Sequence, residues 1–165
     1  TLKSFTTSLR TQSLNMVLFL LVSLLVSVSF GQSGNLTCSS AESCYQLANS
    51  LQLIGTQEAY TQSTVVLYNA VNQYPDDAQL WALFGKLNIF YTLNWHYGHD
   101  LVMKSLQLDS TADNMNGFIF AGWLYSTPTY RDINIATNYY QKAITLNNND
   151  TSNFWPYFEY AAFLS

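Results

Sequence analysis

Beyond residue 40, apolar and small side chains are interspersed with polar ones in a pattern that repeats every 37 residues. Asp76, Asp113 and Asp150 mark this repeat, and a large aromatic residue follows each of the three after five positions. Three and four positions further along, most units carry an apolar residue and then a small one. A repeat of this length is typical of arrays in which one supersecondary unit is stacked several times. The predicted units span about residues 41–76, 77–113, 114–150 and 151–165, the last of them partial.

Each of the first three units contains two apolar stripes with helical spacing, separated by a short polar break. In the third unit, Phe118, Ala121, Gly122 and Tyr125 occupy positions i, i+3, i+4 and i+7, which form one face of a helix. A second stripe follows a break at Pro128, because proline disfavours helical geometry in the residue before it. The pattern therefore predicts a pair of helices in each unit.

The fourth unit supplies a first helix only, over residues 155–164, and no segment shows the two-residue alternation of a strand. Stacked helix pairs bury apolar stripes that a single pair leaves exposed. The sequence predicts an all-α fold, namely an α-solenoid of antiparallel helix pairs with about three and a half repeats. Residues 41–165 form the predicted repeat domain, and residues 32–40 form an N-terminal segment.

Over roughly residues 40–165, this arrangement resembles the tetratricopeptide repeat family. In that family the first helix carries a large aromatic, an apolar and a small residue, and the second carries a small residue, an aromatic, an alanine and a terminal proline or turn. The closest matches to the second-helix pattern are Ala136, Tyr140, Ala143 and Asn148, followed by Ser63, Leu67, Ala70 and Pro75. The units are longer than the usual length of about 34 residues. Ser105 replaces the alanine of the second unit, while Asn88 and Glu159 stand where an aromatic and a small residue are expected.

The resemblance implies that the first helix of every unit lines a concave groove that binds a protein or peptide. The groove residues that it implies are Glu42, Tyr45, Asn49, Gln79, Ala82, Lys86, Asn116, Ile119 and Trp123. Tyrosine and tryptophan offer large, rigid contact areas, and asparagine and glutamine amides can hydrogen-bond an extended backbone. Lys86 is the only base in this set, which argues against a groove that clamps a carboxylate with several bases.

An apolar run precedes the repeats. Residues 16–30 contain no charge, and their length is below the roughly 20 residues that a helix needs to cross a bilayer. Small groups at Ser29 and Gly31 suit the narrow site of a signal peptidase. We therefore predict a signal peptide over residues 1–31, with cleavage after Gly31. The alternative is a single membrane anchor.

Residues 1–15 add positive charge to this leader through Lys3 and Arg10. They form either the n-region of the signal or, because position 1 is not Met, untranslated sequence or the tail of a fragment. Removing residues 1–31 takes away both bases and no acid, which changes the formal charge from −4 to −6. A chain this acidic argues against nucleic acid, and against a membrane beyond the signal segment, as partners.

Two further features favour export, to the lumen of the secretory pathway or out of the cell. Asn35 and Asn149 each begin an N-glycosylation sequon. Cys38 and Cys44 are the only cysteines, and a pair in an exported chain favours a disulfide bond over the alternative of two reduced, buried thiols. Between them, residues 39–42 resemble a capping box, which predicts the start of a helix.

The composition agrees with a folded domain that has little catalytic chemistry. The chain is 48% hydrophobic and only 10% charged, which excludes disorder driven by charge. His96, His99 and Asp100 lie close enough in sequence to ligate a metal, but the same residues also suit the beginning of a helix. Neither an activated nucleophile nor a glycine-rich phosphate loop is recognisable. We therefore expect no enzyme activity and no cofactor.

The main hypothesis is an exported, non-catalytic scaffold that binds a protein or peptide. The first alternative is an assembly subunit, or self-association, in which the last helix packs against another chain. That helix is rich in apolar residues, namely Trp155, Phe158, Tyr160, Phe163 and Leu164. The second alternative is a metal-dependent enzyme that uses His96, His99 and Asp100.

Overall fold

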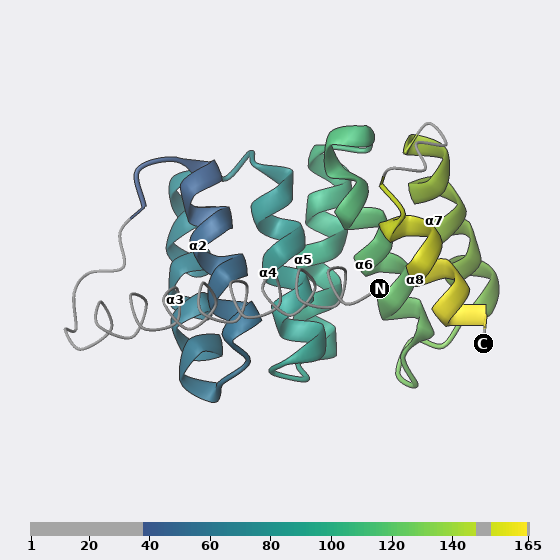
Figure 1. Cartoon of the computed structure of the whole chain (residues 1–165), viewed down its shortest axis with the longest axis horizontal. Helices are drawn as coiled ribbons and strands as arrows, with labels where there is room; N and C mark the ends of the chain where they lie inside the picture. The colour runs from purple at the N-terminus through teal and green to yellow at the C-terminus, as the bar shows by residue number, and fades with distance from the viewer. Residues whose placement is uncertain (1–37, 148–152, 165) are drawn as a thin grey trace, which may run out of the picture. The chain divides into compact units, whose positions relative to one another are not determined.

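The computed structural model describes residues 38–147 and 153–164, which form seven α-helices, one 3-10 helix and no strand (Figure 1). The elements are α2 (Ala41–Ile54), α3 (Gln57–Gln73), α4 (Ala78–Phe90), α5 (Trp95–Leu108), η1 (Ala112–Asn114), α6 (Met115–Ser126), α7 (Ile133–Leu146) and α8 (Trp155–Leu164). The prediction of an all-α fold is confirmed for this part of the chain. The leader over residues 1–31 and both sequons, at Asn35 and Asn149, lie outside the described residues.

Helices that follow one another in the sequence pair through short turns. α2 packs against α3, α4 against α5 and α6 against α7, and these are the most extensive helix contacts. The first helices of the pairs also touch in series, α2 with α4, α4 with α6 and α6 with α8. Figure 1 shows the pairs side by side in chain order. Because one antiparallel helix separates them, successive first helices run in the same direction and present neighbouring surfaces.

Short polar side chains determine where the helices begin. Thr56, Asp77, Asn94 and Asp132 each accept a hydrogen bond from the backbone N–H three residues later, which satisfies one of the unpaired donors of the first turn. The capping box of α2 differs from the predicted one. Its two members are Ser40 and Ser43, one residue later than the pattern of residues 39–42 indicated, because the Ser43 hydroxyl takes the place of a glutamate.

Small residues lie where the paired helices approach most closely. A Cβ atom on Gly85 would lie 2.5 Å from Val102 Cγ2 and 3.1 Å from the Val102 backbone nitrogen on α5. A Cβ atom on Gly122 would lie 2.8 Å from two ring atoms of Tyr140 on α7. Tyr140 is 1% exposed, and its ring also contacts Phe163 of α8. The small positions of the repeat are therefore required by helix packing.

Ser105 and Asn88, which depart from the tetratricopeptide pattern, each take part in hydrogen bonds. Asn114 is fully buried and donates from Nδ2 to Ser105 Oγ at 2.8 Å and to the Asp109 carbonyl at 2.9 Å. Ser105 Oγ in turn donates to Asn114 Oδ1. Asn88 donates to the Phe84 carbonyl at 2.9 Å within its own helix. Hydrogen bonds thus compensate for burying polar groups at these positions.

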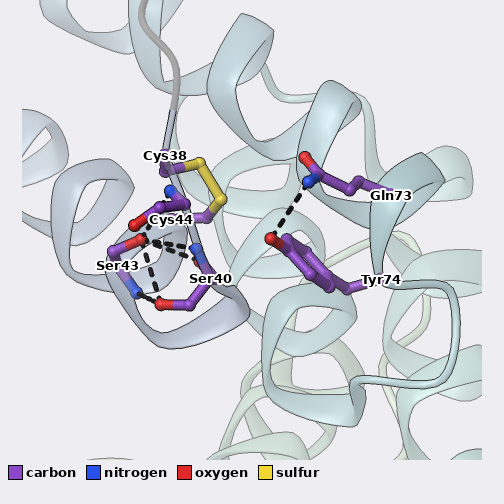
Figure 2. The surroundings of a disulfide bond; sticks show 7 residues. Cys38, Ser40, Ser43, Cys44, Gln73 and Tyr74 are labelled. Atoms are coloured by element: carbon purple, nitrogen blue, oxygen red, sulfur yellow. Dashed lines mark hydrogen bonds between the residues drawn. A yellow bond between two sulfur atoms is a disulfide. The ribbon is translucent and has the colours of Figure 1, made fainter.

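Cys38 and Cys44 form a disulfide bond, as predicted (Figure 2). Their Cα atoms are 5.1 Å apart, and Cys44 is completely buried in the first turns of α2. Figure 2 shows the bond beside the hydrogen-bonded pair Ser40 and Ser43, so the same short segment is held both covalently and by the capping box. The alternative of two reduced thiols is excluded. A disulfide bond suggests an oxidising, secretory-type environment.

Among the helices of residues 38–147 and 153–164, none combines the length and the hydropathy that a membrane span requires.

Candidate binding surface on the first helices

Most of the predicted groove residues are half-buried. Glu42 is exposed, and the half-buried ones are Tyr45, Asn49, Gln79, Lys86, Asn116 and Trp123. These six come from α2, α4 and α6, the first helices that contact one another in series. We call these six residues the first-helix surface.

Ala82 and Ile119 do not belong to this surface. Ala82 is 1% exposed and Ile119 is 0% exposed, and both belong to the hydrophobic core. They occupy the same position of the 37-residue period as Tyr45, but unlike Tyr45 they are fully buried. The prediction that they line a groove is therefore corrected, because side chains enclosed between helices have no area left for a ligand.

Hydrogen bonds join the first helices across this surface. Asn116 Nδ2 of α6 donates to the Tyr45 hydroxyl of α2 at 3.3 Å, although the two residues are 71 positions apart. Burial raises the pKa of the Tyr45 hydroxyl, and the hydrogen bond from Asn116 partly offsets this effect. Gln79 Nε2 donates to the Asp113 carbonyl at 2.9 Å.

Trp123 and Glu159 connect α6 to α8. The indole Nε1 of Trp123 donates to Glu159 Oε2 at 2.5 Å. Glu159 is only 7% exposed, and burial raises the pKa of its carboxyl group, while the bond from Trp123 and the charge of Lys86 act in the opposite direction. This role of Glu159 was not predicted from the sequence. The available signal was a carboxylate at a position where the other units carry Ala48, Gly85 and Gly122.

Lys86 places a cation close to this carboxylate. Its Nζ lies 5.9 Å from the centroid of the Phe120 ring, a distance typical of a cation–π contact. Burial lowers the pKa of the Lys86 ammonium, and the negative charge of Glu159 partly offsets this effect. Within residues 38–147 and 153–164, the pair of basic and acidic side chains within 4.0 Å is His99 with Asp100, so Lys86 and Glu159 interact over a longer distance.

Aromatic rings surround Trp123. Its ring centroid lies 4.5 Å from that of Phe90, 5.2 Å from that of Phe120 and 6.3 Å from that of Trp155. The rings of Phe90 and Trp155 are nearly perpendicular to the indole. Phe90 is 42% exposed and Trp155 is 39% exposed. We call Phe90, Phe120, Trp123 and Trp155 the aromatic patch. Of these four residues, Trp123 was predicted to line the groove, and Trp155 was named in the alternative in which the last helix packs against another chain.

The two histidines contact aromatic residues instead of forming a metal centre. His96 Nδ1 is 2.8 Å from the Tyr130 hydroxyl, and the ring of His99 stacks on the ring of Tyr130 with centroids 5.0 Å apart. His99 Nδ1 is 3.1 Å from Asp100 Oδ1. In the part of the chain that the structure describes, no three His, Cys, Asp or Glu side chains are placed to hold a metal ion together.

A separate open hollow of about 310 Å³ lies between α6 and α7. Its lining residues are Phe118, Ile135, Asn138, Tyr139 and Lys142. None of these residues was predicted to bind a ligand. Asn138 and Lys142 are exposed, and the hydroxyl of half-buried Tyr139 donates to the Met103 sulfur at 3.9 Å, so no fully buried polar side chain lines the hollow to fix the orientation of a small molecule.

A scan of the sequence against protein-family models finds no match, and a search of curated proteins finds no similar sequence.

Proposed function

We propose that this chain is a non-catalytic scaffold that binds a protein or peptide on its first-helix surface. In this proposal the helix pairs form a short solenoid similar to tetratricopeptide repeats, with the first helices on its concave side. One observation carries the proposal: six half-buried residues on three contacting helices combine amides, rings and one ammonium. Such a mixture suits an extended backbone with apolar side chains.

The proposal includes export from the cytoplasm. The Cys38–Cys44 disulfide supports it, because such bonds persist mainly in oxidising compartments. The predicted signal peptide over residues 1–31 and the sequons at Asn35 and Asn149 are further parts of the proposal. N-terminal sequencing of the secreted protein tests the signal peptide, because the mature chain should begin at Gln32. A loss of mass after enzymatic removal of N-glycans tests the sequons.

An assembly role is the second candidate function, because α8 exposes aromatic and apolar side chains. Phe158 is 55% exposed and Leu164 is 63% exposed. Exposed apolar area of this kind favours contact with another chain. Analytical ultracentrifugation tests this role: a monomer at all concentrations would count against self-association, whereas a dimer that Phe158→Ser dissociates would support it.

Selection from a library of random peptides displayed on phage tests the binding function. We expect the purified protein to enrich peptides whose affinity falls about 10-fold when Asn49 on α2 is changed to Lys. The matched control is Asn69→Lys on α3, an exposed second-helix position where the same substitution should leave the affinity unchanged. Circular dichroism establishes that both variants are folded. Failure to enrich any peptide, or equal losses in both variants, would contradict the proposed function.

A further inference from the structure

Lys86 and Glu159 both retain unused hydrogen-bonding capacity beside the aromatic patch. Trp123 occupies one oxygen of Glu159, and no described residue donates a hydrogen bond to the other. The Lys86 ammonium likewise donates no hydrogen bond to a described residue. Among the described residues, the side-chain nitrogen or oxygen atom that is both fully buried and without a hydrogen-bond partner is Gln52 Oε1. The free groups of Lys86 and Glu159 therefore keep some contact with solvent.

The surroundings restrict what can satisfy both groups. Lys86 and Glu159 are each partly desolvated, as the opposite directions of their pKa changes indicate. A cationic ligand would meet the Lys86 ammonium, and an anionic ligand would meet the Glu159 carboxylate, so either would lose hydration next to a like charge. A neutral group with one donor and one acceptor avoids this repulsion. The backbone of a peptide supplies such groups at every residue.

We propose that Lys86 and Glu159 together bind the backbone of one uncharged, apolar residue in an extended peptide. The Lys86 ammonium donates to a carbonyl oxygen of that segment, and the free Glu159 oxygen accepts from one of its N–H groups. The apolar side chain of the bound residue packs on the exposed rings of Phe90 and Trp155. This inference rests on the proposed function and adds the chemical class of the bound residue.

The aromatic patch also gives the bound residue a rigid surface to pack on. Trp123 is held by its bond to Glu159 and by the rings on either side of it. A rigid ring offers contact area with little loss of side-chain entropy on binding. Sugar rings can use the same combination of aromatic faces and polar groups, so a neutral glycoside serves as the competing probe.

Titration with blocked amino acids, followed by the NMR signal of the Trp123 indole N–H, tests the subsite. The probes are N-acetyl-leucine methylamide, its lysine and aspartate counterparts, and methyl glucoside. We expect a saturable shift with the leucine probe and binding about 10-fold weaker for both charged probes. Lys86→Met and Glu159→Gln should each weaken binding of the leucine probe about 10-fold or more, since each removes a charge-assisted hydrogen bond.

Two matched variants control for unspecific effects of charge. Lys104→Met on α5 and Glu58→Gln on α3 alter exposed residues and should leave binding of the leucine probe unchanged. A leucine probe that gives no saturable shift, or binds Lys86→Met and Glu159→Gln as tightly as the wild type, overturns the subsite. So does a glucoside that saturates when the leucine probe does not. When the NMR titration gives one of these negative results, the phage-selected peptides show which proposal has failed. If their affinity still falls in the Asn49→Lys variant, only the subsite has failed; if it does not, the proposed function has failed as well.

Discussion

The indole nitrogen of Trp123 and the carboxylate of Glu159 are joined by a hydrogen bond of 2.5 Å, although 36 residues separate them in the sequence. The bond connects two helices, α6 and α8. It holds a charged group that is 7% exposed within an aromatic environment. A buried carboxylate is stable there only because specific partners compensate for its desolvation.

The raised pKa of Glu159 predicts an unusual pH dependence of stability. Because the folded protein binds this proton more tightly than the unfolded chain, ionisation of Glu159 lowers the free energy of unfolding as the pH rises through the folded pKa. Relative to Glu159→Gln, the wild type should therefore gain stability as the pH falls from neutral, and the gain should level off below the ordinary value of 4.5. Urea denaturation over this pH range provides the measurement. If the wild type instead loses stability relative to the variant on acidification, the prediction is contradicted.

The buried bonds between Ser105 and Asn114 predict coupled mutational effects. Ser105→Ala restores the residue typical of the repeat but removes a partner of Asn114, so it should lower the free energy of unfolding by about 1–3 kcal/mol. Asn114→Ala should have an effect of similar size. The double variant should lose less than the sum of the two, because each single change leaves the other group unpaired. Strict additivity in denaturant titrations would show that the bonds contribute nothing.

The disulfide predicts a redox-dependent stability. Replacing both Cys38 and Cys44 with alanine should lower the free energy of unfolding by about 2 kcal/mol, the value expected from loop entropy for a short closed loop. A reducing agent should lower the melting temperature of the wild type and leave that of the double variant unchanged. If the reducing agent lowers the melting temperature of both proteins equally, it does not act through the disulfide.

The close approach of α4 and α5 predicts that Gly85 tolerates no side chain. Gly85→Ala should destabilise the protein by about 1–3 kcal/mol through overpacking against Val102, despite the better helix propensity of alanine. Adding Val102→Ala removes the methyl group that lies 2.5 Å from the new Cβ and should recover part of the loss. Thermal melts of the single and double variants distinguish this cause. A Gly85→Ala variant as stable as the wild type would contradict the packing described above.

The helices could be predicted from the sequence because their determinants are local. The 37-residue period places apolar and small residues on one face, and Gly85 and Gly122 are small where neighbouring helices touch. Residues such as Asp77 and Asp132 mark the beginnings of helices through bonds to nearby backbone groups. The disulfide could be predicted for the same reason, since its two cysteines lie six positions apart.

The candidate site was only partly predictable, because its decisive contacts join residues that lie far apart in the sequence. The family pattern indicates which positions flank the core, but it does not distinguish Ile119, which is enclosed by neighbouring helices, from Trp123, which reaches the surface. Phe90 joins the patch through its contact with Trp123 on another helix. Glu159 departs from the pattern, and the partner that explains it becomes apparent only when α6 and α8 are in contact.

The central claim is that a peptide binds across the first helices. Hydrogen–deuterium exchange of the protein, with and without a saturating peptide from the phage selection, tests this claim most directly. We expect slower exchange along α2, α4 and α6 in the complex, and a smaller effect in the Asn49→Lys variant. Protection confined to α3, α5 and α7 would place the ligand on the second helices and would contradict the account.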